Sequence, residues 1–372
     1  MISTMGFRSR LLSILVLVLP MMGPVSSSAQ ESGRIDDELK RTGFVYFPII
    51  FSTPETGFAL GSAIGLYQRP AGATSEVRPS TLQPMFIYTM KKQLITQIGL
   101  DLYLRDGMYR IILDLGYQKY PDKFWGIGND LADSAEEDFS SRKGTLALEF
   151  QREIGSGLNL GLQYQFARSR IIDVTSGGLL DTGGVPGEDG ARVSGAGFVV
   201  NWDTRDNIFS PLSGRWYQLS ARFYGDGLGS DFSYSRYNLD LREYVTLGPE
   251  QILACQAYGL FITGKPPFEH MPRLGGANMM RGYYQGRYSD ENMFTLQAEY
   301  RRPLRGRLGM VAFAGAGDVA HEIRDFKLGD FKYSFGLGLR VLFSPEERIN
   351  LRIDFAWGRE NSGMYINLME AF

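Results

Sequence analysis

Two residues of this sequence are well placed to form a specific polar site: an arginine in a glycine-rich stretch and a glutamate in the strand after it. Arg281 stands in the stretch 272–283, whose glycines let the backbone bend tightly. The following segment, 292–303, alternates apolar and polar residues, which places Glu299 on its polar face. If that face lines the inside of a barrel, the stretch can fold inward. Arg281 and Glu299 would then form a buried, charge-assisted pair.

Catalytic chemistry has few candidates. His270 and His321 are the 2 histidines of the chain, and both fall in expected external loops. The sequence contains no Gly-x-Ser-x-Gly and no histidine-rich metal spacing. His321 with Asp318 would imitate the acid–histidine pair of an outer-membrane protease, so an external-loop hydrolase is a remote alternative. Gly315-x-Gly317-x-x-Ala320 mimics a dinucleotide motif, but no helix follows it. We expect no enzyme, cofactor or metal.

The N-terminal residues are typical of a secretory signal. Arg8 and Arg10 precede the apolar run 11–19, and small residues at Ser27 and Ala29 offer a cleavage site. The apolar run is shorter than the roughly 20 residues that a membrane helix needs. We therefore expect a signal peptide over 1–29, a short polar periplasmic arm over 30–42 and a barrel over 43–372.

The composition suits a membrane barrel better than a soluble secreted domain. The chain has 45 Gly, 24 Phe and 20 Tyr, whereas its single Cys, Cys255, cannot form an internal disulfide. A net charge of −2 offers no basic surface for nucleic acid. Sixteen segments have the length and alternation of tilted membrane strands. They are 43–51, 57–68, 80–90, 93–104, 107–119, 141–153, 157–169, 192–203, 214–225, 231–244, 251–264, 290–302, 307–315, 331–343, 347–358 and 363–372.

Connection lengths separate a transmembrane barrel from a soluble sandwich. Short turns and long loops alternate along the chain, as they do in barrels with short periplasmic turns and long external loops. The long connections are 120–140, 170–191, 265–289 and 316–330, and two turns at the other end, 69–79 and 203–213, are exceptions. The charged strand residues share the polar face: Asp101, Arg110, Asp114, Glu149, Arg222, Arg236, Asp240, Arg242, Glu299, Arg340, Arg352 and Asp354. We expect that face to line a wet lumen of mixed charge.

Three motifs together carry a family resemblance. Gly275-Gly276 followed by Arg281-Gly282-Tyr283, then Glu299-Tyr300-Arg301-Arg302-Pro303, resembles the inward-folded sixth loop and next strand of the outer-membrane protein insertase superfamily. Within it the chain is similar to the bacterial surface antigen family, with a BamA/TamA-like barrel. The resemblance covers nearly the whole mature chain. It implies an all-β, sixteen-stranded antiparallel transmembrane barrel of the outer membrane.

The resemblance also implies a lumen clamp made of Arg281, Gly282, Tyr283 and Glu299. The family usually offers the arginine a second carboxylate on the thirteenth strand, but Gly315 stands at that position here. Two alternatives follow: the clamp is weaker here, or Asp318, three residues further on, reaches back.

Two further segments match the family at the other end of the barrel. Asn201 to Asn207, with Asp203, Arg205 and Asp206, resembles the periplasmic turn between the eighth and ninth strands; from the residues alone it is an ordinary turn with an Asp203–Arg205 pair. The final aromatic, Phe372, resembles a C-terminal insertion signal and also suits the interface position of a closing strand. In that strand Glu370 falls on the apolar face, near the rim.

By resemblance, we expect the chain to assist insertion or translocation of outer-membrane components. The resemblance implies four kinds of partner: outer-membrane lipids, unfolded outer-membrane proteins, a separate periplasmic receiver and the machinery that inserts the barrel itself. Residues 30–41 leave no room for a POTRA domain, the family's periplasmic module. The alternative is therefore a passive pore, a surface antigen or an accessory barrel. An insertase would use an imperfectly closed seam between the first and last strands, whose unpaired edge templates an incoming strand. Pro54, in the first hairpin, is consistent with a weak seam.

Overall fold

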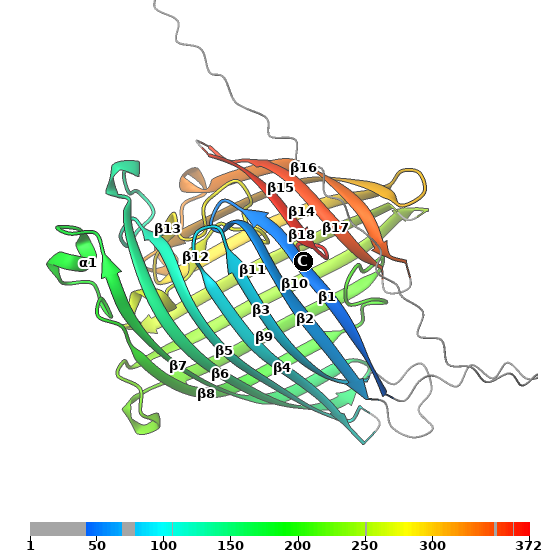
Figure 1. The fold of residues 1–372 in the computed structure, drawn as a ribbon, viewed down its shortest axis with the longest axis horizontal. Helices are drawn as coiled ribbons and strands as arrows, with labels where there is room; N and C mark the ends of the chain where they lie inside the picture. Colours follow the sequence, from blue (N-terminus) through cyan, green and yellow to red (C-terminus); the bar gives the residue numbers. More distant parts are fainter. Residues whose placement is uncertain (1–41, 69–78, 106, 250, 346–347, 360) are drawn as a thin grey trace, which may run out of the picture. The chain divides into compact units, whose positions relative to one another are not determined.

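Strands that alternate apolar and polar residues close on themselves into one barrel (Figure 1). The computed structural model describes residues 42–68, 79–105, 107–249, 251–345, 348–359 and 361–372. The expected signal peptide and all of the polar arm before Thr42 lie outside these ranges.

The barrel has sixteen antiparallel strands, each paired with its neighbour along the chain. They are β1 Thr42–Thr53, β2 Gly57–Gln68, β3 Ser80–Thr89, β4 Leu94–Leu104, β5 Tyr109–Phe124, β6 Glu137–Gly155, β7 Leu158–Val174, β8 Arg192–Asp203, β9 Gly214–Tyr224, β10 Tyr234–Gly248, β11 Gln251–Gly264, β14 Asn292–Pro303, β15 Leu308–Ala320, β16 Lys332–Ser344, β17 Ile349–Trp357 and β18 Ser362–Leu368. The expected fold class is confirmed, and every expected strand is present.

Short elements decorate the connections. The two-stranded sheet of β12, Arg273–Leu274, and β13, Tyr288–Ser289, lies between β11 and β14. The helical turns are α1 Leu179–Thr182, η1 Asp133–Ala135, η2 Asp226–Leu228, η3 Phe268–His270, η4 Ile323–Asp325 and η5 Leu328–Asp330. Among the residues described, no helix is both long enough and apolar enough to cross a membrane.

The main differences from the expected strands lie at the ends of elements. β5, β6 and β7 continue past their expected limits at 119, 141 and 169, because they stay paired beyond the wall and enclose a hydrophobic cluster. Phe124, Phe139, Leu180 and Phe268 form that cluster, which joins the long loops to one another. At the C-terminus β18 stops at Leu368, four residues before the expected end at 372.

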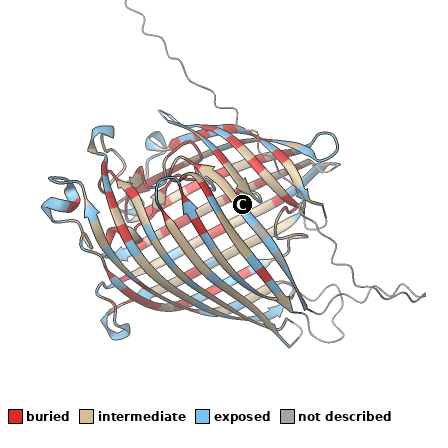
Figure 2. Cartoon of the chain, viewed as in Figure 1, coloured by how far each residue is buried: buried red, intermediate tan, exposed pale blue. Residues whose placement is uncertain are grey.

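The two faces of the wall have opposite character. Along β16 buried and exposed residues alternate almost without a break (Figure 2). Large apolar side chains point outward and are exposed, among them Leu60, Phe86, Leu162, Phe198, Leu219 and Phe335. Arginines, carboxylates and glutamines occupy the inner positions, among them Arg340, Arg352, Asp354, Glu299 and Gln256. An apolar outer band around a polar interior is the arrangement of a transmembrane barrel.

The seam is the boundary between β1 and β18, where the barrel closes. Within the described residues, these strands share one residue pair, Ser52 with Ile366. On its other side β1 pairs with β2 along its whole length, from Thr42 to Thr53. In the described part of the two strands, most of the β1 backbone that faces the seam therefore has no ladder partner.

Candidate functional site

The connection 265–291, called loop 6 here, turns back into the barrel instead of extending away from it. Gly275 and Gly276 have φ of 107° and 105°, a left-handed backbone that glycine adopts without strain. The Gly276 N–H donates to the Tyr283 carbonyl at 3.1 Å, and β12 and β13 pair at the base of the loop. These contacts fold the stretch 275–283 into a compact hairpin-like unit.

Gly282 lies directly against the wall. Its φ is 106°, and a side-chain Cβ there would meet the Gly358 nitrogen at 2.8 Å, a backbone atom that cannot swing aside. Its N–H donates to the Tyr365 hydroxyl of β18 at 2.9 Å. The next residue, Tyr283, donates its hydroxyl to the Tyr333 carbonyl at 3.0 Å. Glycine at this position lets loop 6 approach β17 and β18 at backbone contact.

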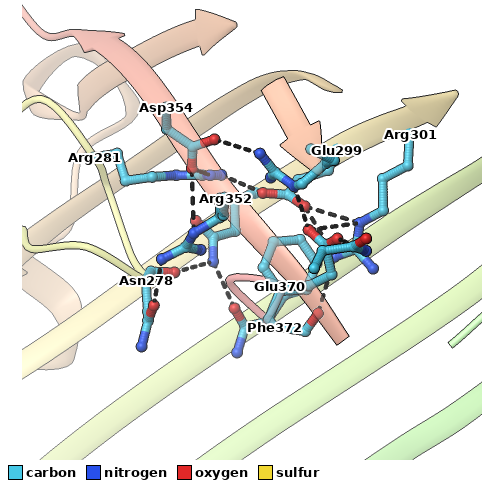
Figure 3. Close-up of polar contacts among 12 residues, drawn as sticks. Asn278, Arg281, Glu299, Arg301, Arg352, Asp354, Glu370 and Phe372 are labelled. Atoms are coloured by element: carbon cyan, nitrogen blue, oxygen red, sulfur yellow. Dashed lines mark hydrogen bonds and ion pairs between the residues drawn. The ribbon is translucent and has the colours of Figure 1, made fainter. Parts of the chain in front are cut away.

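Arg281 points into the lumen and is 2% exposed. Its guanidinium pairs with two carboxylates, Glu299 of β14 and Asp354 of β17 (Figure 3). It also lies over the Phe313 ring of β15, with 3.5 Å between the guanidinium carbon and the ring centroid. One loop residue thus connects three separate strands of the wall by charge-assisted and cation–π contacts.

These residues belong to a larger group of buried charges, called the clamp cluster here: Arg281, Arg301, Arg340, Arg352, Glu299, Asp354 and Glu370. Arg301 donates to Glu299 at 2.9 Å, and Arg340 donates to Asp354 at 2.6 Å. Arg352 donates to the Asn278 side chain at 3.0 Å and so reaches back to loop 6 (Figure 3). Each carboxylate is therefore shared between arginines, and removal of one arginine leaves its carboxylate partners with fewer compensating charges in a buried site.

The prediction that Asp318 is the second carboxylate partner of Arg281 is wrong. Asp318 does not reach Arg281, because Lys332 donates to it at 2.6 Å and Asn129 donates to it at 3.2 Å. On β15 the residue opposite Glu299 is Phe313, whose ring packs against the Arg281 guanidinium. The second negative charge comes from Asp354, two strands further around the barrel.

The C-terminal residues also depart from expectation. Met369 has φ of 69°, which breaks the alternation of β18 and turns the hook, residues 369–372, into the lumen. Glu370 accordingly faces inward, where Arg340 donates to it at 2.8 Å and Asn350 at 2.8 Å. Phe372 packs against Tyr244, among other inner-wall residues, rather than at the lipid interface. The hook thereby joins the clamp cluster.

The outer part of loop 6 is fixed to other loops. Arg273 donates to Asp122 at 2.7 Å, and Arg287 donates to Asp133 at 2.7 Å. The Gln285 N–H donates at 2.9 Å to Glu55, which lies in the turn between β1 and β2. Loop 6 therefore contacts both flanks of the seam, β18 through Gly282 and the β1–β2 turn through Gln285.

The turn between β8 and β9 has its own ion pairs at the other end of the barrel. Arg205 donates to Asp203 at 2.9 Å, as expected for a self-contained turn. Asp206 accepts from Arg348, in the turn between β16 and β17, at 2.5 Å. Burial alone would raise the pKa of Asp206, but hydrogen bonds from Arg348 and from backbone N–H groups lower it. The turn motif thus ties two turns that are distant in sequence.

The two histidines have unlike surroundings. His270 lies in a connection between strands, as expected, but it is buried and shares a hydrogen bond of 2.9 Å with the Tyr234 hydroxyl. Burial and the nearby cations of Lys143, Arg236 and Arg222 hold the pKa of His270 well below its usual value. His321 is exposed and lies 3.8 Å from Asp290 and from Glu291, so the His321–Asp318 pair of the hydrolase alternative is not formed. In the described part of the chain, no three His, Cys, Asp or Glu residues gather as a metal site.

A transmembrane barrel with a long loop folded into its lumen defines a class of outer-membrane protein, and comparisons with known proteins agree. The Omp85 superfamily domain matches residues 92–368, so the chain belongs to the Omp85 superfamily. The superfamily match and the BamA-like fold indicate a barrel of the outer membrane. No curated protein matches the sequence.

Solved structures show the same fold at low sequence identity. BamA from Haemophilus ducreyi lacking POTRA domains 1–3 has a TM-score of 0.62 and 12% identity, over 88% of this chain and 71% of that chain. CdiB from Acinetobacter baumannii has a TM-score of 0.56 and 14% identity, over 89% of this chain and 60% of that one. CdiB from Escherichia coli has a TM-score of 0.58 and 10% identity, over 88% of this chain and 62% of that chain. The chain spans less than two thirds of each CdiB structure.

Proposed function

We propose that the protein assists insertion or translocation of outer-membrane components by opening its seam, which loop 6 holds shut. The observation that supports this is the contrast at the seam itself. β1 and β18 share one residue pair, whereas loop 6 donates to Tyr365 of β18 and to Glu55 of the β1–β2 turn. Loop 6 therefore connects the two flanks by contacts of its own, in addition to their short ladder.

An under-paired edge inside lipid has a physical use. Each backbone N–H or C=O without a partner in hydrocarbon is costly, because no water is present to bind it. An incoming strand can satisfy these groups by pairing with β1, as peptides do when they add to a sheet edge. The seam would then act as a template for client strands without any covalent chemistry.

The proposed clients are unfolded outer-membrane barrel proteins, delivered by a periplasmic receiver. Membership of the Omp85 superfamily and the BamA-like fold support this client class. The mixed charge of the clamp cluster supports a gate rather than an ion-selective pore, because the cluster does not form a ring of one sign.

The test is the folding rate of a client barrel in lipid vesicles that contain the purified protein. A disulfide between Ser52→Cys and Ile366→Cys, in a Cys255→Ser background, locks the seam at its recorded pair. We expect the protein to accelerate client folding at least tenfold, and the lock to remove the acceleration until a reductant is added.

A matched lock elsewhere in the wall controls for rigidity. Leu100→Cys with Leu113→Cys joins β4 to β5 at a recorded residue pair far from the seam. This control should leave the acceleration intact. If the protein gives no acceleration while its own folding is unchanged, the insertase role is wrong and a passive or accessory barrel is the better account.

A further inference from the structure

The lipid-facing surface of β9, β10, β11, β14 and β15 carries a groove of about 580 Å³. Five small side chains line it, Cys255, Ala257, Ala298, Ala314 and Ala316, beside the larger Tyr217, Leu241 and Leu296. Cys255 pairs with Ala298 and Ala298 with Ala314, so these three form one continuous row of small residues across neighbouring strands. In the next row Leu296 separates Ala257 from Ala316. Four strand spacings of about 4.8 Å give the groove a length of about 19 Å.

One end of the groove is charged, which is unusual on a surface that faces lipid. Asp240, Arg242 and Tyr244 of β10 alternate along the strand and contact lumen residues. Glu243 stands between Arg242 and Tyr244, so its own side chain points to the opposite, outer face. Glu243 pairs across the strands with Cys255, and both line the groove. It lies five residues before the end of β10 at Gly248, on the side of the short turns.

The charge is only partly neutralised by the protein. Tyr217 donates its hydroxyl to Glu243 Oε2, and Arg215 lies 3.3 Å from Glu243 Oε1. The side chains of Arg215 and Glu243 remain 40% and 35% exposed. A carboxylate can accept about four hydrogen bonds, so Glu243 retains acceptor sites that face the lipid. An outward charge in the hydrocarbon region is costly unless it finds a partner.

We propose that this groove binds a phospholipid of the ethanolamine class from the periplasmic leaflet, with one acyl chain along the row of Cys255, Ala298 and Ala314. The ammonium of its headgroup donates to Glu243, and its phosphate lies against Arg215. Trp202 and Tyr217, which contact each other edge-to-face at 6.0 Å, flank the headgroup as interface aromatics. The charge pattern of cation beside carboxylate complements a zwitterionic headgroup of phosphate beside ammonium.

Native mass spectrometry of the delipidated full-length protein tests the proposal, with phosphatidylethanolamine and phosphatidylcholine of identical acyl chains as probes. The choline headgroup carries no N–H, so it cannot donate to Glu243. We expect at least fivefold tighter binding of phosphatidylethanolamine, and Glu243→Gln should reduce this preference to less than twofold. Ala298→Phe, which fills the groove, should weaken both lipids at least fivefold, whereas Ala196→Phe on β8, outside the groove, should weaken neither.

A second readout requires no change at the site. The Cys255 thiol lines the groove, so a bound lipid should slow its alkylation by a membrane-permeant maleimide. We expect slower alkylation in phosphatidylethanolamine bilayers than in phosphatidylcholine bilayers, by at least threefold. Equal alkylation rates, equal binding of the two lipids, or unchanged binding in Ala298→Phe would each overturn the proposal.

Discussion

At the scale of single residues, the buried charges of the clamp cluster are more telling than any candidate for catalysis. Arg281, Glu299 and Asp354 are each almost fully inaccessible, and none can keep its charge inside the wall without the others. The arrangement is specific because the arginine also needs the Phe313 plane beneath it. The contacts of Arg281 with Glu299, Asp354 and Phe313 therefore form together or are lost together, as expected of a contact that holds loop 6 in one position.

The first prediction concerns this arginine. Arg281→Ala should lower the free energy of unfolding by about 3 kcal/mol, because Glu299 and Asp354 each lose one of their buried ion-pair partners. The measurement is the urea midpoint of the protein in lipid vesicles. Arg192→Ala is the matched control, since Arg192 pairs with Asp231 at 2.9 Å but is 52% exposed. The control should cost no more than about 1 kcal/mol, and equal losses in the two variants would contradict the buried clamp.

The second prediction concerns pH. Burial and neighbouring cations hold the pKa of His270 well below 6.5, so the unfolded chain takes up a proton before the folded one. This histidine should therefore reduce stability as pH falls below about 6.5, with a limiting slope of about 1.4 kcal/mol per pH unit. Urea midpoints between pH 7.5 and pH 5 measure the effect.

The matched control uses the second histidine. His270→Gln should flatten the dependence on pH, because glutamine keeps a polar contact for Tyr234 without binding a proton. His321→Gln, which replaces the other histidine of the chain, serves as the comparison. If both variants keep the wild-type slope, His270 is not the group that titrates.

At the scale of elements, loop 6 depends on glycine as much as on charge. Gly282 combines a left-handed backbone with contact against the Gly358 backbone. Loop 6 reaches β17 and β18 only because no side chain intervenes, and Arg281 is delivered to its carboxylates by that approach. The backbone fit and the ion pairs are therefore two parts of one contact.

The third prediction separates these parts. Gly282→Ala should destabilise the protein by more than the roughly 1–2 kcal/mol that a left-handed alanine costs, because its Cβ also meets backbone atoms. Gly306→Ala is the control, since Gly306 also has positive φ, at 63°, but nothing lies within 4 Å of its would-be Cβ. The urea midpoints of the two variants give the comparison. A Gly282→Ala loss no larger than that of Gly306→Ala would show that loop 6 is not held against the wall.

The sequence predicted the structure best where the alternation of apolar and polar residues alone determines it. Alternation predicted the sixteen strands, and it placed Glu299 on the inner face next to Arg281. Asp354 was also predicted to face inward, but not to pair with Arg281. That pairing depends on how deep loop 6 enters, which the contact of Gly282 with the wall sets in three dimensions. No pattern along the chain encodes this depth.

The C-terminal hook illustrates a second limit. Alternation carried on from β18 assigns Glu370 to the lipid face, but Met369 adopts a left-handed backbone and reverses the register. A non-glycine residue in that conformation is uncommon and has no sequence signature here. Arg340 and Asn350, which hold Glu370 in the lumen, come from strands that are neighbours only after the barrel closes.

At the scale of the whole molecule, two sets of contacts close the barrel. The sheet contributes one residue pair at the seam, and loop 6 contributes hydrogen bonds to both flanks. Under the proposed function, the seam opens when loop 6 is loosened. Loop 6 thereby connects the clamp cluster in the lumen to β18 and the β1–β2 turn at the seam.

The most direct test of this link is the distance between nitroxide labels on either side of the seam in lipid vesicles. Ile50→Cys and Leu368→Cys, in a Cys255→Ser background, stand two residues along each strand from the Ser52–Ile366 pair. We predict one short distance with loop 6 intact, and an added longer population when Arg281→Ala releases the clamp. Labels at Leu100→Cys and Leu113→Cys across β4 and β5 should not change. Identical seam distances with and without Arg281 would contradict the claim that loop 6 holds the barrel shut.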